Sequence, residues 1–169
     1  MALRLVIDGY NLLGVLPREE KFGDMETKRD GLIESLSIYK RLRKVKITVV
    51  FDGTRSKRLT RQREVKSGIE VVFSKDGEEA DRVIKDLASS AGSGLTIVTS
   101  DRDISNLAKA KGAVVIDSNE FLGLLDAALY EDLKGVDPEG EDEGSARKKG
   151  ASRKQKKADR KKAQRIKKL

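Results

Sequence analysis

Residues 4–11, with the sequence RLVIDGYN, decide the fold of this chain, because they join a short apolar run directly to an aspartate. A continuous apolar run of this length is typical of a strand that is buried on both faces of a sheet. The pattern returns in residues 46–53, KITVVFDG, and in residues 95–103, LTIVTSDRD. The acids that follow the three runs are Asp8, Asp52, Asp101 and Asp103.

Segments with helical spacing of apolar residues alternate with these runs, and this order indicates a parallel sheet with helices on both faces. The spacing predicts helices over residues 25–42, 78–91, 103–111 and 119–133. The apolar runs predict strands at residues 3–7, 46–51, 69–73, 95–99 and 113–116. We therefore expect an α/β domain of three layers with a mostly parallel five-stranded sheet.

The carboxyl ends of parallel strands meet at one edge of a sheet, which is where ligands bind in such folds. We expect Asp8, Asp52, Asp101 and Asp103 at this edge, together with Asp81 from the helical segment GEEADRVI. Two carboxylates about 4 Å apart repel by on the order of 4 kcal/mol at an effective dielectric constant near 20. A cation is therefore needed for the cluster, and a chain without histidine or cysteine offers only oxygen ligands. Such ligands favour Mg²⁺ or Mn²⁺.

Each acid also has a purely structural alternative. Asp8 and Asp52 precede glycines, and Asp-Gly pairs often form turns. Asp101 can cap the helix that follows it, and Asp81 can interact with a helix dipole. These alternatives stay open from the sequence alone.

Basic residues concentrate at the end of the chain, where residues 145–169 hold 13 Lys or Arg and one acid. The remaining 144 residues hold 23 basic and 27 acidic side chains, although the whole chain has a net charge of +8. We expect a domain at residues 1–134, an acidic linker at 135–144 and a basic tail at 145–169 that is disordered or becomes helical on RNA. The alternative is a tail that only aids solubility. The expected tail contacts to phosphates are Arg147, Lys148, Lys149, Arg153 and Lys154.

A second basic segment, residues 54–66, follows the second strand and is expected to be a loop or a mobile helical arm. Its cations could follow RNA phosphates towards the acidic edge, or it could be a solvated loop. Tyr10 could stack on a base or pack inside the domain. The candidate RNA-binding residues are Arg55, Lys57, Arg58, Arg61, Arg63 and Lys66.

Several classes of function are excluded by what the chain lacks. Without histidine and cysteine there is no Ser-His-Asp triad, no thiolate chemistry and no ordinary zinc site. The first strand supplies one acid rather than the pair of a phospho-acceptor receiver domain, and position 10 is tyrosine rather than the aspartate of a dehalogenase-like phosphatase. No apolar run could span a bilayer and no secretory signal is present, so we expect a cytoplasmic protein.

The motifs VIDGYN (6–11), VVFDG (49–53), EEADRVI (78–84) and TSDRD (99–103) resemble, in order and spacing, the YacP-like branch of the NYN domain family. That family lies within the PIN-like nuclease superfamily, and the resemblance covers residues 3–130. It implies a PIN-like fold and a metal-dependent endoribonuclease, with RNA as substrate and the ribosome as a candidate partner. It also implies that Asp8, Asp81 and Asp101 hold the metal directly or through water, supported by Asn11, Asp52 and Asp103. The competing hypothesis is a non-catalytic adaptor that binds RNA or the ribosome.

Overall fold

The sheet has six strands in the order β3-β4-β2-β1-β5-β6. The structure is a computed structural model that describes residues 2–17, 23–53, 57–135 and 157–169. The strands are β1 (Arg4–Asp8), β2 (Lys46–Phe51), β3 (Gln62–Lys66), β4 (Ile69–Phe73), β5 (Leu95–Val98) and β6 (Val114–Ile116). All neighbours in the sheet are parallel except β3 and β4.

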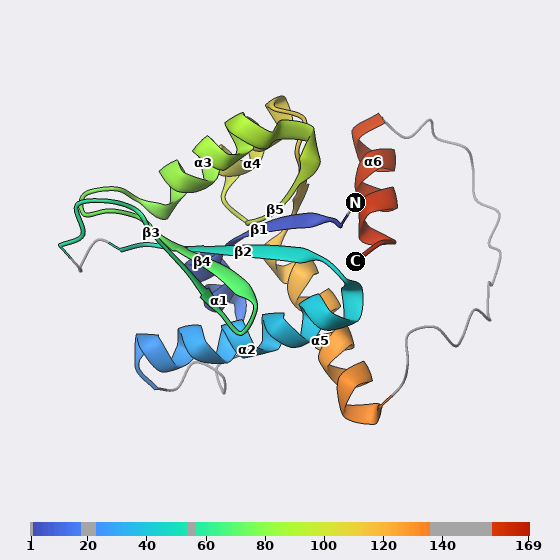
Figure 1. Ribbon diagram of the computed structural model, residues 1–169. Helices are drawn as coiled ribbons and strands as arrows, with labels where there is room; N and C mark the ends of the chain where they lie inside the picture. The colour runs from blue at the N-terminus through green and yellow to red at the C-terminus, as the bar shows by residue number, and fades with distance from the viewer. Residues whose placement is uncertain (1, 18–22, 54–56, 136–156) are drawn as a thin grey trace.

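Helices cover both faces of the sheet, so the domain has three layers (Figure 1). The helices of one face, α3 (Ala80–Ala91) and α4 (Arg102–Ala110), close a core around Val6, Val50 and Ile97. The helices of the other face are α1 (Gly9–Val15), α2 (Met25–Arg43) and α5 (Ser118–Lys134). A 3-10 turn, η2 (Gly92–Gly94), precedes β5. None of the described helices is long and apolar enough to cross a membrane.

Short polar residues set the starts of the helices. Asp24 accepts a hydrogen bond from the Thr27 N–H at 2.7 Å, and Asp117 accepts one from the Asn119 N–H at 2.8 Å. Such caps satisfy backbone donors that have no partner inside the helix. The starts of α2 and α5 are therefore fixed by a capping side chain, whereas α1 and α3 begin without one.

The prediction of five strands was wrong by one, because residues 62–66 form the strand β3 rather than a loop or helical arm. All five of its residues are exposed, so no apolar pattern marks it as a strand. It forms through backbone pairing with β4, from Gln62 opposite Phe73 to Lys66 opposite Ile69. The seven-residue helix α1 was also not predicted, since it is too short to show a helical period.

Register places the ends of three strands side by side. Asp8 lies opposite Val50 of β2, and Ile7 lies opposite Val98 of β5. Asp52 and Thr99 each follow one of these partner strands directly. The carboxyl edge of β1, β2 and β5 is therefore one continuous polar region.

The last part of the chain packs on the domain instead of standing free. Helix α6 (Lys157–Ile166) contacts β6 at the amino edge of the sheet, opposite the acids (Figure 1). Arg165 donates to Thr96 Oγ1 at 3.0 Å, and Lys161 donates to the Gly112 backbone oxygen at 2.7 Å. Leu169 is buried in the core on the face of the sheet that α2 and α5 cover. Residues 157–169 thus have a place in the fold, whereas the expected linker beyond residue 135 and the five tail contacts lie outside the described residues.

We expect Tyr39→Phe to lower the free energy of unfolding by about 1 kcal/mol, the usual net contribution of a hydrogen bond. The buried Tyr39 hydroxyl donates to the Leu169 backbone oxygen at 2.9 Å, so it joins α2 to the end of the chain. Urea denaturation measures the change, and Tyr130→Phe is the control because Tyr130 is 58% exposed. Equal stability of the two variants would contradict the docking of this segment.

Candidate active site at the carboxyl edge of the sheet

Asp8 is the most buried acid of the expected site. It ends β1, and only 8% of its surface is exposed. Burial raises the pKa of its carboxyl to about 6, helped by the nearby charges of Asp81 and Asp101. The Thr99 hydroxyl donates to Asp8 Oδ2 at 3.2 Å. The structure therefore holds this carboxylate in a position where its charge is costly without a cation.

Asp81 reaches the same region from the first turn of α3. Burial raises the pKa of its carboxyl, and the next largest cause is the charge of Asp101. Asp103 raises it to a smaller degree, while Lys85 lowers it from a distance of 3.9 Å. The tertiary structure thus brings Asp8, Asp81 and Asp101 into one electrostatic group from three different elements.

Asp101 has two roles at once. It caps α4, because its Oδ1 accepts from the Ile104 N–H at 3.0 Å. The helix-cap alternative is therefore present in the structure, but it occupies only part of the carboxylate and does not remove Asp101 from the acidic group. Asp103 lies in the first turn of α4 and is exposed.

The glycines after Asp8 and Asp52 are not turn residues of the left-handed kind. Gly9 begins α1, and a Cβ there would lie 2.9 Å from the Val50 backbone oxygen and collide with the Phe51 ring. A Cβ on Gly53 would collide with the Ser74 backbone oxygen. Both glycines permit close packing of backbone at the strand ends, and the pair Asp8-Gly9 is a junction between β1 and α1 rather than a turn.

Asn11 serves mainly to join loops. Its side-chain oxygen accepts from the Ser100 N–H at 2.8 Å and from the Ser118 hydroxyl at 2.6 Å. The Thr99 hydroxyl links the same loop to β1. It donates to Asp8, the last residue of β1, and it accepts from the Asp101 N–H at 3.1 Å. Sequence reasoning missed Thr99 and Ser118. Thr99 lies inside the TSDRD motif and could have been found there, whereas no local pattern marks Ser118.

Asp52 follows the last residue of β2 directly. It contacts Ser74, whose hydroxyl is 3.4 Å from Asp52 Oδ1. That hydroxyl makes its shorter bond, 2.6 Å, to the Glu78 backbone oxygen. The acids whose charges help burial to raise the pKa of the Asp8 carboxyl are Asp81 and Asp101. The structure thus brings three of the five expected acids together firmly, Asp103 more weakly, and Asp52 beside them.

The acidic group suits a hydrated divalent cation better than a fully coordinated one. Among the residues that the structure describes, no three acids form a ready-made set of direct ligands. Mg²⁺ usually keeps several waters and binds through one or two carboxylates plus a substrate phosphate. Asp8, Asp81 and Asp101 offer carboxylates of this kind. Their negative charges make it costly for each to be ionised beside the others, and a cation would offset that cost.

The expected basic arm is largely paired within the domain. Arg61 binds Glu78 and Asp86, Arg63 binds Glu70, and Lys66 binds Asp30. The remaining two described cations of the set, Lys57 and Arg58, have no carboxylate partner among the described residues, and Arg55 lies outside them. The structure places Tyr10 against Phe51, with ring centroids 5.1 Å apart. RNA binding by the six cations therefore stays a prediction, with Arg58 the member best placed for it.

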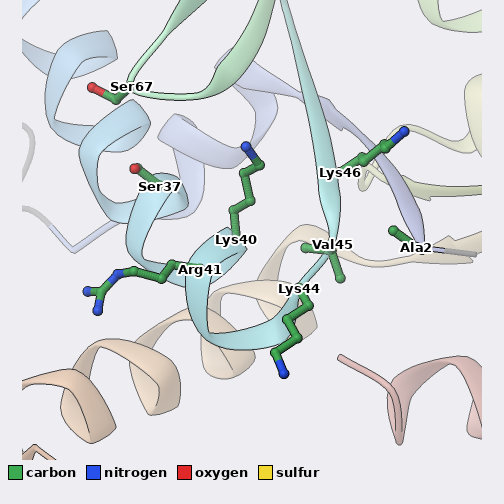
Figure 2. A pocket seen from close by; sticks show the side chains of 8 residues that line it. All are labelled: Ala2, Ser37, Lys40, Arg41, Lys44, Val45, Lys46 and Ser67. Atoms are coloured by element: carbon green, nitrogen blue, oxygen red, sulfur yellow. The ribbon is translucent and has the colours of Figure 1, made fainter.

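A pocket of about 430 Å³ lies at the opposite, amino edge of the sheet. Figure 2 shows that its cationic side chains point in different directions rather than towards one point. Arg41 pairs with Asp132 at 2.7 Å, and Lys40 donates to the Gly68 backbone oxygen at 2.8 Å. The pocket is therefore separate from the acidic edge. Its lining residues are Ala2, Ser37, Lys40, Arg41, Lys44, Val45, Lys46 and Ser67.

Comparison with known proteins supplies the family. The sequence model of the YacP-like NYN domain matches residues 5–169. The chain belongs to the YacP-like NYN domain family. The resemblance of the four motifs is thereby confirmed, and the match continues beyond them through the basic tail. The family has a PIN-like, nuclease-type domain.

Relatives of this YacP-like chain come from Bacillus subtilis. An uncharacterised protein named YacP is 31% identical over 123 residues, which are 70% of this chain and 72% of YacP. Two crystal structures of Rae1 (YacP) have a TM-score of 0.64. One of them is 27% identical, and the match covers 80% of both chains. The structure of a point mutant is 26% identical and covers 78% of this chain and 80% of its own. The predicted α/β fold is confirmed by these neighbours.

Proposed function

We propose that this YacP-like protein is a metal-dependent endoribonuclease that hydrolyses RNA phosphodiesters at the carboxyl edge of the sheet. The observation that supports it is the burial of Asp8 beside Asp81 and Asp101, since burial, helped by those two charges, raises the pKa of the Asp8 carboxyl to about 6. Acids gathered at this cost are candidates for binding a cationic ligand. The family supports a nuclease-type domain as the setting.

The three carboxylates would hold Mg²⁺ or Mn²⁺, directly or through water. When bound, the cation would lower the pKa of the attacking water and offset the negative charge that develops at phosphorus. In the reaction, the water oxygen bonds to phosphorus, the bond to the leaving ribose oxygen breaks, and the water proton passes to solvent or to that oxygen. Thr99 orients the Asp8 carboxylate, and the Asp101 cap on α4 holds the second carboxylate in place.

A cleavage assay tests this function. Labelled single-stranded and structured RNAs are incubated with Mg²⁺, with Mn²⁺ or with a chelator, with and without ribosomes. We expect cut products that require the metal. The ribosome arm is included because the family resemblance extends to ribosome-associated endoribonucleases.

We expect Asp101→Asn to reduce cleavage about 10–100-fold, the range seen when groups around a metal are changed. The asparagine oxygen still accepts from the Ile104 N–H, so α4 keeps its cap and the fold persists by circular dichroism. RNA binding that survives without any metal-dependent product, in wild type and with ribosomes, would favour the adaptor instead.

A further inference from the structure

Two arginine side chains share one aromatic ring beside the acidic edge. Phe73 ends β4, and the guanidinium carbon of Arg58 lies 4.6 Å from the centre of its ring. The guanidinium carbon of Arg29, from α2, lies 5.5 Å from the same centre. All three side chains are partly buried. Two positive charges on one ring repel each other, so the arrangement favours an anion between or beside them.

Neither arginine has a carboxylate partner in the part of the chain that the structure describes. Arg29 uses one donor, Nη1, for the Tyr10 hydroxyl at 2.9 Å, and a guanidinium has five N–H donors. Among the other described arginines that are partly buried, Arg43 and Arg61 have carboxylate partners, and Arg165 donates to Thr96 and to the Ser93 backbone oxygen. The arginines with carboxylate partners are Arg41, Arg43, Arg61, Arg63 and Arg82.

The pair is held in place before any ligand binds. Arg29 also lies 5.9 Å from the centre of the Phe51 ring, and Phe51 and Phe73 stack with centroids 5.9 Å apart. Tyr10 completes this aromatic group. A cation that is already positioned loses little conformational entropy on binding, and the planar guanidinium suits phosphate oxygens.

The aromatic group lies on the other side of the sheet from the acids but at the same edge. Phe51 lies opposite Phe73 in the register and packs in the core on the α2 side. Asp8 has the same strand parity as Val6, which faces α3 and α4, and it couples to Asp81 of α3. An RNA strand that crosses the carboxyl edge would therefore meet the acids first and the arginines next.

We infer that Arg29 and Arg58 form a phosphate-binding subsite for a nucleotide that neighbours the cleaved bond. The inference rests on the proposed function for its substrate class, and it adds a residue, Arg29, that sequence reasoning did not select. It also separates Arg58 from the paired Arg61, Arg63 and Lys66, whose charges are already offset by carboxylates.

The test is binding of a fluorescent single-stranded RNA in a chelator at several salt concentrations, so that no cleavage is needed. We expect the double variant Arg29→Gln with Arg58→Gln to weaken RNA binding about tenfold. Because two phosphate contacts are lost, the slope of log K against log salt concentration should become shallower by about 1.4. The matched control is Arg4→Gln with Lys46→Gln, which removes two exposed charges from paired positions at the amino edge. The control variant should change the RNA affinity and the salt slope by less than half as much as the test variant does.

Each outcome of this experiment decides between stated alternatives. Equal losses in the test and control variants would overturn the subsite, even if the protein cleaves RNA. A specific loss in the test variant, without cleavage by the wild type, would support the subsite and count against the nuclease. Tighter binding of polyglutamate than of RNA by the wild type would replace RNA with an acidic protein. Arg29→Lys with Arg58→Lys keeps the two charges but removes the planar guanidinium groups, so it should weaken binding while leaving the salt slope nearly unchanged.

Discussion

Asp8→Asn is expected to slow metal-dependent RNA cleavage at least about 100-fold, the upper end for groups that surround a metal. The same change should stabilise the metal-free protein at neutral pH. The reason is that burial and the charges of Asp81 and Asp101 raise the pKa of the Asp8 carboxyl from 3.8 to about 6. That difference is worth on the order of 3 kcal/mol against the charged form. Asparagine has nearly the same shape and removes the charge.

The two effects have opposite signs, which makes the experiment discriminating. Cleavage is followed with labelled RNA in Mg²⁺, and stability by urea denaturation in a chelator. Asp126→Asn is the matched control, since Asp126 is an exposed acid on α5. An Asp8→Asn protein that cleaves like the wild type would refute the site. Lost cleavage without a gain in stability would show that Asp8 is not under electrostatic strain in the free protein.

The contribution of Asp8 to the stability of the metal-free protein is expected to fall as the pH rises from about 4 to about 6. In this window the folded protein binds the Asp8 proton and the unfolded chain has released it, because the pKa of Asp8 is about 6 in the fold and 3.8 outside it. Stability from a raised carboxyl pKa is fully present below the unfolded value and is lost as the pH passes the folded value. The loss from Asp8 alone should be on the order of 3 kcal/mol. Asp81, whose pKa is also raised, contributes in the same direction.

Other carboxyls change stability with the opposite sign, so the wild type must be compared with Asp8→Asn. The side-chain hydrogen bonds from Arg61 and from Arg43 hold the pKa values of Glu78 and Glu131 below their usual range. These pairs add stability as the pH rises through the acidic range. Urea denaturation of both proteins between pH 4 and pH 8 isolates the contribution of Asp8. Saturating Mg²⁺ should recover the lost stability at pH 7 in the wild type only, and an identical response of Asp8→Asn would contradict the metal site.

The layered fold and most of the acidic site could be predicted from local patterns. Buried apolar runs such as LVI and ITVVF indicate parallel strands, and an aspartate at the end of such a run must lie at the carboxyl edge. The positions of Asp8, Asp52 and Asp101 follow from this alone. The strand β3 could not be predicted, because its exposed residues carry no apolar pattern and its pairing with β4 is made by the backbone.

The sequence by itself thus determined which elements form and which acids reach one edge of the sheet, since periodicity and position along the chain are local properties. Only the tertiary structure decided that Asp81 and Asp101 couple to Asp8 while Asp52 contacts Ser74. It also placed Arg29 against Phe73 and buried Leu169 below the sheet. The physical reason is that these relations depend on how distant segments pack against each other, and such packing leaves no mark on the spacing of residues within a segment.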